Sequence, residues 1–111
     1  MKLLTKEIEK KLRANEVIAR ETGESGEPVV KWFNPTGAGT WLISDMDEDG
    51  RCFGLCDLGM GTPELGSVSI KELEDIRLPF GLGIERDIHW EANKSLMDYA
   101  NDAREYGYIR A

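Results

Sequence analysis

An apolar stripe with helical spacing runs through the first part of the chain. Its members are Leu4, Ile8, Leu12, Val17 and Ile18. Residues three or four positions apart lie on one face of an α-helix. Thr5 can cap this helix by accepting a hydrogen bond from the amide three residues later. We therefore predict a helix from Thr5 to about Glu21, ended by the polar stretch 21–28, which contains Gly, Ser and Pro.

Short apolar and β-branched runs, bounded by turn residues, predict strands after this helix. The runs are residues 29–33, 40–44, 51–58 and 65–70, with residues 88–90 as a fifth and last strand. β-Branched and aromatic residues are typical of strands. Only a short turn separates the second run from the third, so we expect these two strands to form an antiparallel hairpin.

Capping signals predict two further helices. Ser69 followed by Glu72 matches a capping box, which opens a short helix over residues 70–76. Ser95, with an aspartate three residues on, opens another helix that ends at Tyr106 before a glycine. The expected fold class is α+β: a small antiparallel sheet of four to five short strands, with the N- and C-terminal helices packed on it.

The composition is that of one ordinary globular domain, residues 1–111. The chain has 41% apolar and 32% charged residues, which is not a disordered composition. No apolar run approaches the length of about 18 residues that a membrane span needs. Charged residues also interrupt the apolar start that a signal peptide would require. We therefore expect a cytoplasmic protein that does not bind a membrane.

Acidic residues outnumber basic ones, and the net charge at pH 7 is −7. The first twenty residues carry six Lys or Arg against three Glu, whereas the rest carries eight against eighteen Asp or Glu. Because nucleic-acid affinity comes mainly from cations that displace counterions, direct nucleic-acid binding is not expected. A protein with a basic surface is the expected partner, since opposite charges accelerate encounter. Acidity that serves solubility alone is the alternative, and the oligomeric state stays open.

The two cysteines, Cys52 and Cys56, are four positions apart on the third predicted strand. In a strand their Cα atoms are about 13 Å apart, whereas a disulfide requires roughly 4.4–6.8 Å. We interpret them as two buried thiols on the same face of the sheet. With one histidine and no Cys-x-x-Cys pair in the sequence, we predict no metal site and no cofactor.

The acidic run Asp45-x-Asp47-x-Asp49-Gly50 matches the first six positions of a calcium-binding loop. The twelfth position of such a loop is a bidentate Glu, and in this chain it is Cys56. The same acidic residues and glycine also suit a tight turn between two strands. We therefore predict a hairpin turn here rather than a calcium site.

The stretch 78–90 combines a proline and two glycines with apolar and charged residues. Its candidate binding residues are Glu85, Arg86, Asp87, His89 and Trp90. We expect Arg86 to be structural, because its planar guanidinium can fasten the loop to carboxylates or backbone carbonyls. An acid–base pair formed with its charged neighbours is the alternative. Leu82 and Ile84 are expected to anchor the loop in the core, and His89 to be a half-buried strand residue.

Two tryptophans, Trp32 and Trp41, lie in predicted strands. Core packing is the first interpretation of both. The alternative is binding, because an exposed tryptophan would mark a binding face. Both are therefore candidate binding residues.

Several segments, taken in order, resemble a bacterial family of unknown function. They are the Met-Lys-Leu-Leu-Thr start, residues 30–33, 40–41, 52–55 and 65–77, and the Gly-Leu-Gly-Ile-Glu-Arg-Asp stretch at 81–87. The resemblance spans about residues 1–91 and leaves the C-terminal helix outside. This family consists of small proteins common on plasmids, prophages and integrative elements, so the resemblance implies a role on a mobile genetic element. The chain departs from the family pattern in the acidic turn at 45–50 and in His89-Trp90.

The leading hypothesis is a non-enzymatic, acidic protein-binding module of a mobile genetic element, one that inhibits or modulates a host defence or replication protein. The acidity, the small size and the lack of a recognisable catalytic motif in the sequence favour a binding module, and the role on a mobile genetic element is what the family resemblance implies. The alternative is an enzyme or small-ligand-binding protein with its site between Gly81 and Trp90. A pocket with a perturbed carboxylate beside Arg86 would favour the alternative, whereas an acidic face with exposed tryptophan would favour the module.

Overall fold

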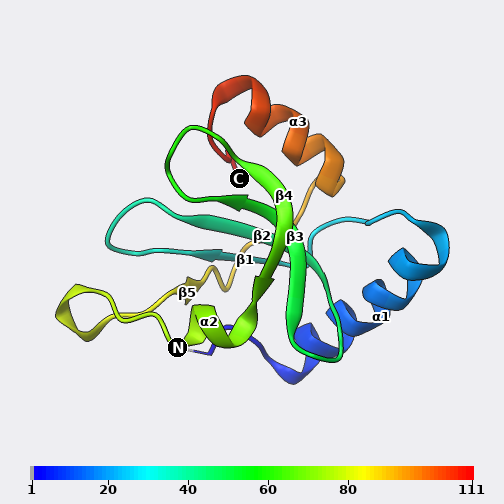
Figure 1. The fold of residues 1–111 in the computed structure, drawn as a ribbon, viewed down its shortest axis with the longest axis horizontal. Coiled ribbons are helices and arrows are strands. Elements are labelled where there is room, and N and C mark those ends of the chain that lie inside the picture. Colours follow the sequence, from blue (N-terminus) through cyan, green and yellow to red (C-terminus); the bar gives the residue numbers. More distant parts are fainter. Residues whose placement is uncertain (1) are drawn as a thin grey trace.

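A five-stranded antiparallel sheet forms the centre of the protein in a computed structural model that describes residues 2–111 (Figure 1). The strands are β1 (Val30–Phe33), β2 (Thr40–Met46), β3 (Arg51–Asp57), β4 (Glu64–Ser69) and β5 (Glu85–Arg86). The helices are α1 (Lys6–Thr22), α2 (Ile70–Glu74) and α3 (Leu96–Tyr106), with a 3-10 turn, η1 (Pro79–Gly81). The spatial order of the strands is β4-β3-β2-β1-β5. The predicted α+β class is confirmed, with helices at both ends of the chain.

The first four strands form a meander in which each strand pairs with the next one along the chain. The fifth strand was predicted at residues 88–90, and this prediction is wrong. The residues that pair with β1 are Glu85 and Arg86, which lie opposite Phe33 and Trp32. Residues 88–90 form a turn instead, in which the Trp90 amide donates to the carbonyl of Asp87 at 3.2 Å.

The predicted helix starts are confirmed at the level of single hydrogen bonds. The hydroxyls of Thr5, Ser69 and Ser95 each accept from the backbone amide three residues later, at 3.0, 3.3 and 3.1 Å. Gly107 ends α3 in the left-handed conformation, with φ at 82°. The helix boundaries are therefore set by local side-chain chemistry.

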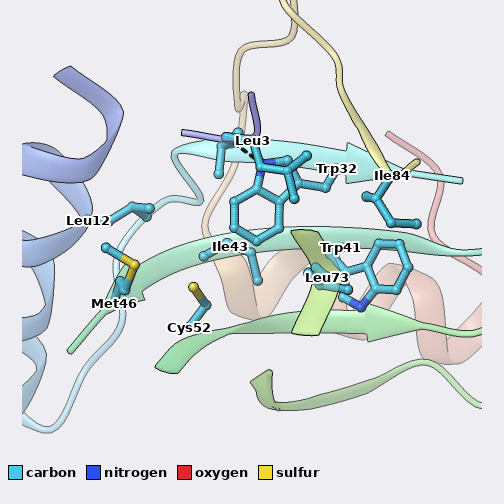
Figure 2. Packing of buried hydrophobic residues seen from close by; sticks show 10 residues of the cluster. Leu3, Leu12, Trp32, Trp41, Ile43, Met46, Cys52, Leu73 and Ile84 are labelled. Carbon is cyan, nitrogen blue, oxygen red and sulfur yellow. Dashed lines mark hydrogen bonds between the residues drawn. The ribbon is translucent and has the colours of Figure 1, made fainter. Parts of the chain in front are cut away.

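One face of the sheet carries the larger hydrophobic cluster, shown in Figure 2. Its centre is Trp32, whose side chain is fully buried and whose indole Nε1–H donates to the carbonyl of Leu3 at 2.9 Å. The other buried members are Leu3, Leu12, Val30, Trp41, Ile43, Met46, Cys52, Leu73 and Ile84. Leu12 is the one fully buried residue of α1, and Val17 and Ile18 are exposed. The predicted apolar stripe therefore packs only in the first half of the helix.

A second cluster covers the opposite face of the sheet, beneath α3. Trp41 and Ile43 belong to the first cluster and Leu42 to the second, as the alternation of side chains along a strand requires. The buried members are Leu42, Leu55, Leu96, Tyr99, Ala100, Ala103 and Ile109. Both faces of the sheet are thus covered.

The two cysteines lie on the face of the first cluster, as predicted. Cys52 is buried and Cys56 is partly buried, and both are free thiols. Burial raises the pKa of Cys52 to about 12 and the pKa of Cys56 to about 11. Because the thiolate is the reactive form, both side chains are poor nucleophiles at neutral pH.

Asp57, at the end of β3, fastens two distant segments. It is buried, its Oδ1 accepts from the amide of Gly59 at 2.8 Å, and its Oδ2 accepts from the amide of Ile109 at 3.0 Å. Ile109 packs into the second cluster. A single carboxylate therefore holds both the β3–β4 loop and the segment that follows α3.

Within residues 2–111, no helix combines the length and the apolar character that crossing a bilayer requires.

Candidate functional site

The segment between α2 and β5 forms a loop that protrudes from the body of the molecule, at the lower left in Figure 1. We refer to residues 77–84 as the Phe80 loop. The Leu78 amide donates to the carbonyl of Leu82 at 2.9 Å, and the Leu82 amide donates to the carbonyl of Pro79. These two hydrogen bonds close the loop at its base. Phe80 lies at the tip, and its side chain is 95% exposed.

The backbone of Phe80 has an unusual conformation. Its φ angle is 64°, and it is the one non-glycine residue with positive φ in residues 2–111. This left-handed region is sterically unfavourable for residues that carry a Cβ. The loop thus holds an aromatic side chain in solvent on a strained backbone.

A hollow of about 390 Å³ lies under the Phe80 loop. It is lined by Lys2, Leu3, Glu74, Ile76, Arg77 and residues 81–85. Of the two predicted anchors, Ile84 is buried, as expected, but Leu82 is 38% exposed and faces the hollow. Only one anchor therefore reaches the core, and the loop tip extends beyond it.

Arg86 binds a backbone carbonyl, as expected for a structural arginine. Its Nη1 donates to the backbone carbonyl of Lys2 at 2.9 Å, which links β5 to the start of the chain. Its neighbour Asp87 forms an ion pair with Lys31 at 3.8 Å and accepts the amide of His89. The charges of this stretch therefore fasten the edge of the sheet.

We expect Arg86→Lys to lower the free energy of unfolding by about 1 kcal/mol and Arg86→Ala by about 2 kcal/mol. Lysine keeps the charge but cannot reproduce the planar arrangement of donors. Urea denaturation followed by circular dichroism measures both, with the exposed Arg104→Lys as the control. Equal stabilities of Arg86→Lys and wild type would contradict the structural role.

His89 and the three candidate tryptophans do not form a shared exposed site with Arg86. His89 was predicted as a half-buried strand residue, and this is wrong: it is exposed in the 88–90 turn. Trp90 lies against the second cluster, with its ring centroid 6.0 Å from that of Tyr99. Trp32 and Trp41 are buried in the first cluster, which agrees with the core interpretation. Residues 85–90 are therefore close in sequence but lie in different surroundings.

The acidic run forms the predicted hairpin turn between β2 and β3. Asp47 Oδ1 accepts the amides of Asp49 and Arg51 at 2.9 and 3.0 Å, and Gly50 adopts a φ of 78°. Asp45, which was predicted to lie in the turn, is on β2, next to a shift in the strand register between Ile43 and Asp45. Within residues 2–111, no three Asp, Glu, His or Cys side chains converge as a metal-binding group.

Two shallow hollows, of about 400 and 350 Å³, lie between the second half of α1 and this hairpin. Asp45 lines the smaller one and is 8% exposed, with Ser44 Oγ donating to its Oδ2 at 3.1 Å. Burial raises the pKa of the Asp45 carboxyl, and the charge of Glu16 adds to this, whereas the Ser44 hydrogen bond opposes it. The acidic run drew attention to Asp45, but its burial on the sheet was not predictable, because the register shift between Ile43 and Asp45 depends on the pairing with β3.

We expect Asp45→Asn to be more stable than wild type at pH 7. The raised pKa means that the folded protein disfavours the ionised carboxyl, and asparagine removes that charge. The gain shrinks as the pH falls through the raised folded pKa and disappears below the unfolded value of 3.8, since both forms are then neutral. Thermal melts between pH 3.5 and 7 measure this, with exposed Asp49→Asn as the control. A constant difference across this pH range would contradict the assignment.

The fold and these sites define the class: a small α+β domain with an open antiparallel sheet and a protruding aromatic loop. A family model described as a protein of unknown function (DUF2958) matches residues 3–110, and the chain belongs to this family. The match includes α3, which the resemblance seen in the sequence left outside. No curated protein and no solved structure matches the chain.

Proposed function

We propose that this protein is a non-enzymatic protein-binding module, which docks through the Phe80 loop onto a partner with a basic surface and an apolar pocket. The observation that carries this proposal is the 95% exposure of Phe80 at the tip of the loop. Aromatic side chains of this kind are enriched in the cores of protein interfaces.

The exposed position of Phe80 and its left-handed backbone do not stabilise the isolated domain. Burying a phenylalanine side chain stabilises a protein by about 1.5–3 kcal/mol, which this domain does not gain from Phe80. The left-handed backbone costs roughly a further 1–2 kcal/mol. A partner pocket would recover the burial term, so the loop is suited to insertion into another molecule.

The charge of the chain defines the kind of partner. A net charge of −7 on 111 residues favours encounter with a basic protein and disfavours encounter with nucleic acid. We place this partner among host defence or replication proteins, with the module carried on a mobile genetic element. This part of the proposal is supported by the resemblance of the sequence to proteins of such elements.

The proposal is tested by affinity capture from the native host, with wild type and Phe80→Ala compared at low and high salt. We expect the partner to be captured by wild type, released by salt and lost with Phe80→Ala. Phe80→Ala should fold with unchanged stability, because the side chain that it removes is 95% exposed. Phe80→Gly should be more stable than wild type, because glycine adopts positive φ without strain. Tyr108→Ala removes another exposed aromatic and is the matched control. Equal capture by Phe80→Ala and wild type would overturn the docking role of the loop.

A small-ligand site is the second candidate, favoured by the hollow of about 390 Å³ under the same loop. Its lining contains two cations, Lys2 and Arg77, and two anions, Glu74 and Glu85. This pattern suits a small zwitterionic molecule. A saturable rise in melting temperature with such a molecule, lost in Glu85→Gln but kept in Phe80→Ala, would support this function instead.

A further inference from the structure

Strand β4 forms one edge of the sheet, and β3 is its one strand neighbour in residues 2–111. Its six residues, Glu64–Ser69, pair with β3 in an unbroken register from Cys56↔Glu64 to Arg51↔Ser69. The other edge, β5, has two residues. β4 and β5 are the two opposite edges of the sheet, and β4 leads directly into α2, which precedes the Phe80 loop. The molecule therefore presents one long edge strand, distinct from the loop described above.

The common protections of an edge strand are missing from β4. Natural proteins shield such edges with lysine, proline, bulges or very short strands. β4 contains no lysine and no proline, its pairing with β3 has no bulge, and its one charged residue is Glu64. At Gly66 no described atom lies within 4 Å of the place that a Cβ would take, so the face of the sheet is uncrowded there. The sequence and pairing of β4 are therefore those of an edge strand without the common protections.

The direction of the free backbone groups follows from the ladder. The amide of Ile70 donates to the carbonyl of Gly50 at 2.9 Å, in the position that continues the β3–β4 register. Antiparallel pairs alternate between hydrogen-bonded and non-hydrogen-bonded positions. Val68, Gly66 and Glu64 therefore direct their backbone groups toward β3. Leu65 and Ser67 direct their N–H and C=O groups away from the sheet, whereas Ser69 is the N-cap of α2.

The surroundings of β4 indicate what kind of strand fits. A hollow of about 220 Å³ runs along its first half, lined in part by Leu58, Met60 and Glu64, and Met60 is 72% exposed. Ser67 borders a second hollow, which is lined by Glu16 and Asp45 together with Arg20 and Arg51, so opposite charges are already present there. A strand added at this edge can place an apolar group against Met60 and a basic group near Glu64. A second copy of the chain would bring its own charge of −7 and is disfavoured.

We propose that β4 binds an extended, basic segment of a partner protein by strand addition, with Ser67 at the centre of the new ladder. This inference rests on the proposed function, because it assumes a partner with a basic surface. It adds a second contact surface and the conformation of the segment bound there. Main-chain hydrogen bonds supply affinity in this mode, and alternate side chains supply specificity.

The experiment uses the peptide acetyl-Thr-Lys-Val-Lys-Val-Lys-Thr-amide as a probe, titrated to about 1 mM into the isotopically labelled protein. We expect amide shifts centred on residues 65–69 and slower hydrogen exchange at Ser67. Ser67→Pro removes an outward-facing donor but no bond to β3, so it should fold and bind the peptide about tenfold more weakly. Ser67→Ala keeps the N–H and should bind as wild type does. The same peptide with glutamate in place of lysine should bind at least about tenfold more weakly.

Several outcomes would overturn the proposal. They are equal binding by Ser67→Pro and wild type, shifts centred away from β4, and no binding at about 1 mM. Concentration-dependent shifts of residues 65–69 without peptide, together with a mass twice 12.5 kDa, would assign the edge to a second copy instead. Phe80→Ala is expected to leave peptide binding unchanged. Failure of the β4 proposal and failure of the Phe80 docking role are therefore measured separately.

Discussion

Replacing Trp32 by alanine is expected to reduce the free energy of unfolding by about 3–5 kcal/mol, the typical loss for a large buried aromatic residue. Trp32 is fully buried, at the centre of the first cluster (Figure 2), and packs between the start of the chain and the middle of the sheet. Its removal leaves a cavity and deprives the Leu3 carbonyl of its indole donor. Because a domain of this kind is stable by only about 5–15 kcal/mol, much of the population can unfold.

Urea denaturation followed by far-ultraviolet circular dichroism measures this effect without relying on tryptophan fluorescence. Trp32→Phe should show a smaller loss, since most of the volume remains while the indole hydrogen bond is removed. Phe80→Ala is the matched control, because it removes an aromatic side chain that is 95% exposed. A Trp32→Ala variant as stable as Phe80→Ala would contradict the assignment of Trp32 to the core.

Asp57→Ala is expected to lower stability by about 3 kcal/mol, because it leaves two amide donors without their acceptor. Asp57→Asn should also destabilise, since both carboxylate oxygens accept and an amide group can replace only one of them. Hydrogen exchange of residues 107–110 should accelerate in both variants, reflecting release of the segment after α3. Asp49→Ala, at an exposed position of the hairpin turn, is the control. Unchanged exchange in this segment would show that Asp57 does not hold it.

The parts of the fold that depend on neighbouring residues were predictable from the sequence. The three helix starts were identified because Thr5, Ser69 and Ser95 each bond to an amide three residues away. The hairpin turn was identified because Asp47 folds back onto the amides that follow it. These interactions are encoded within a few positions, and no knowledge of the tertiary structure is needed to find them.

The parts that depend on distant residues were not predictable. The position of β5 follows from its pairing with Trp32 and Phe33, whereas the apolar run at 88–90 suggested a strand that does not form. Asp45 is displaced from the turn by a bulge whose position depends on β3. Gly54 marks this crowded region, since a Cβ there would come within 2.0 Å of the Leu42 carbonyl oxygen.

The candidate site was predicted in part. The structural contact of Arg86 follows from the chemistry of a guanidinium beside irregular backbone, and its carbonyl partner at Lys2 confirms it. Phe80 was missed, although the run Leu78-Pro79-Phe80-Gly81 carried a signal, an aromatic residue between proline and glycine. Apolar residues are assigned to the core by default, and only the structure shows that this one lies in solvent.

The late position of β5 has a consequence for the order of folding. The first four strands pair with their neighbours along the chain, so each pairing closes a short loop. The pairing of Trp32 with Arg86 joins residues far apart in sequence, and its larger closure entropy delays it. We expect a four-stranded meander to assemble first and β5 to join it in the final step. In native protein, the same edge should open first, and such opening would briefly uncover Trp32.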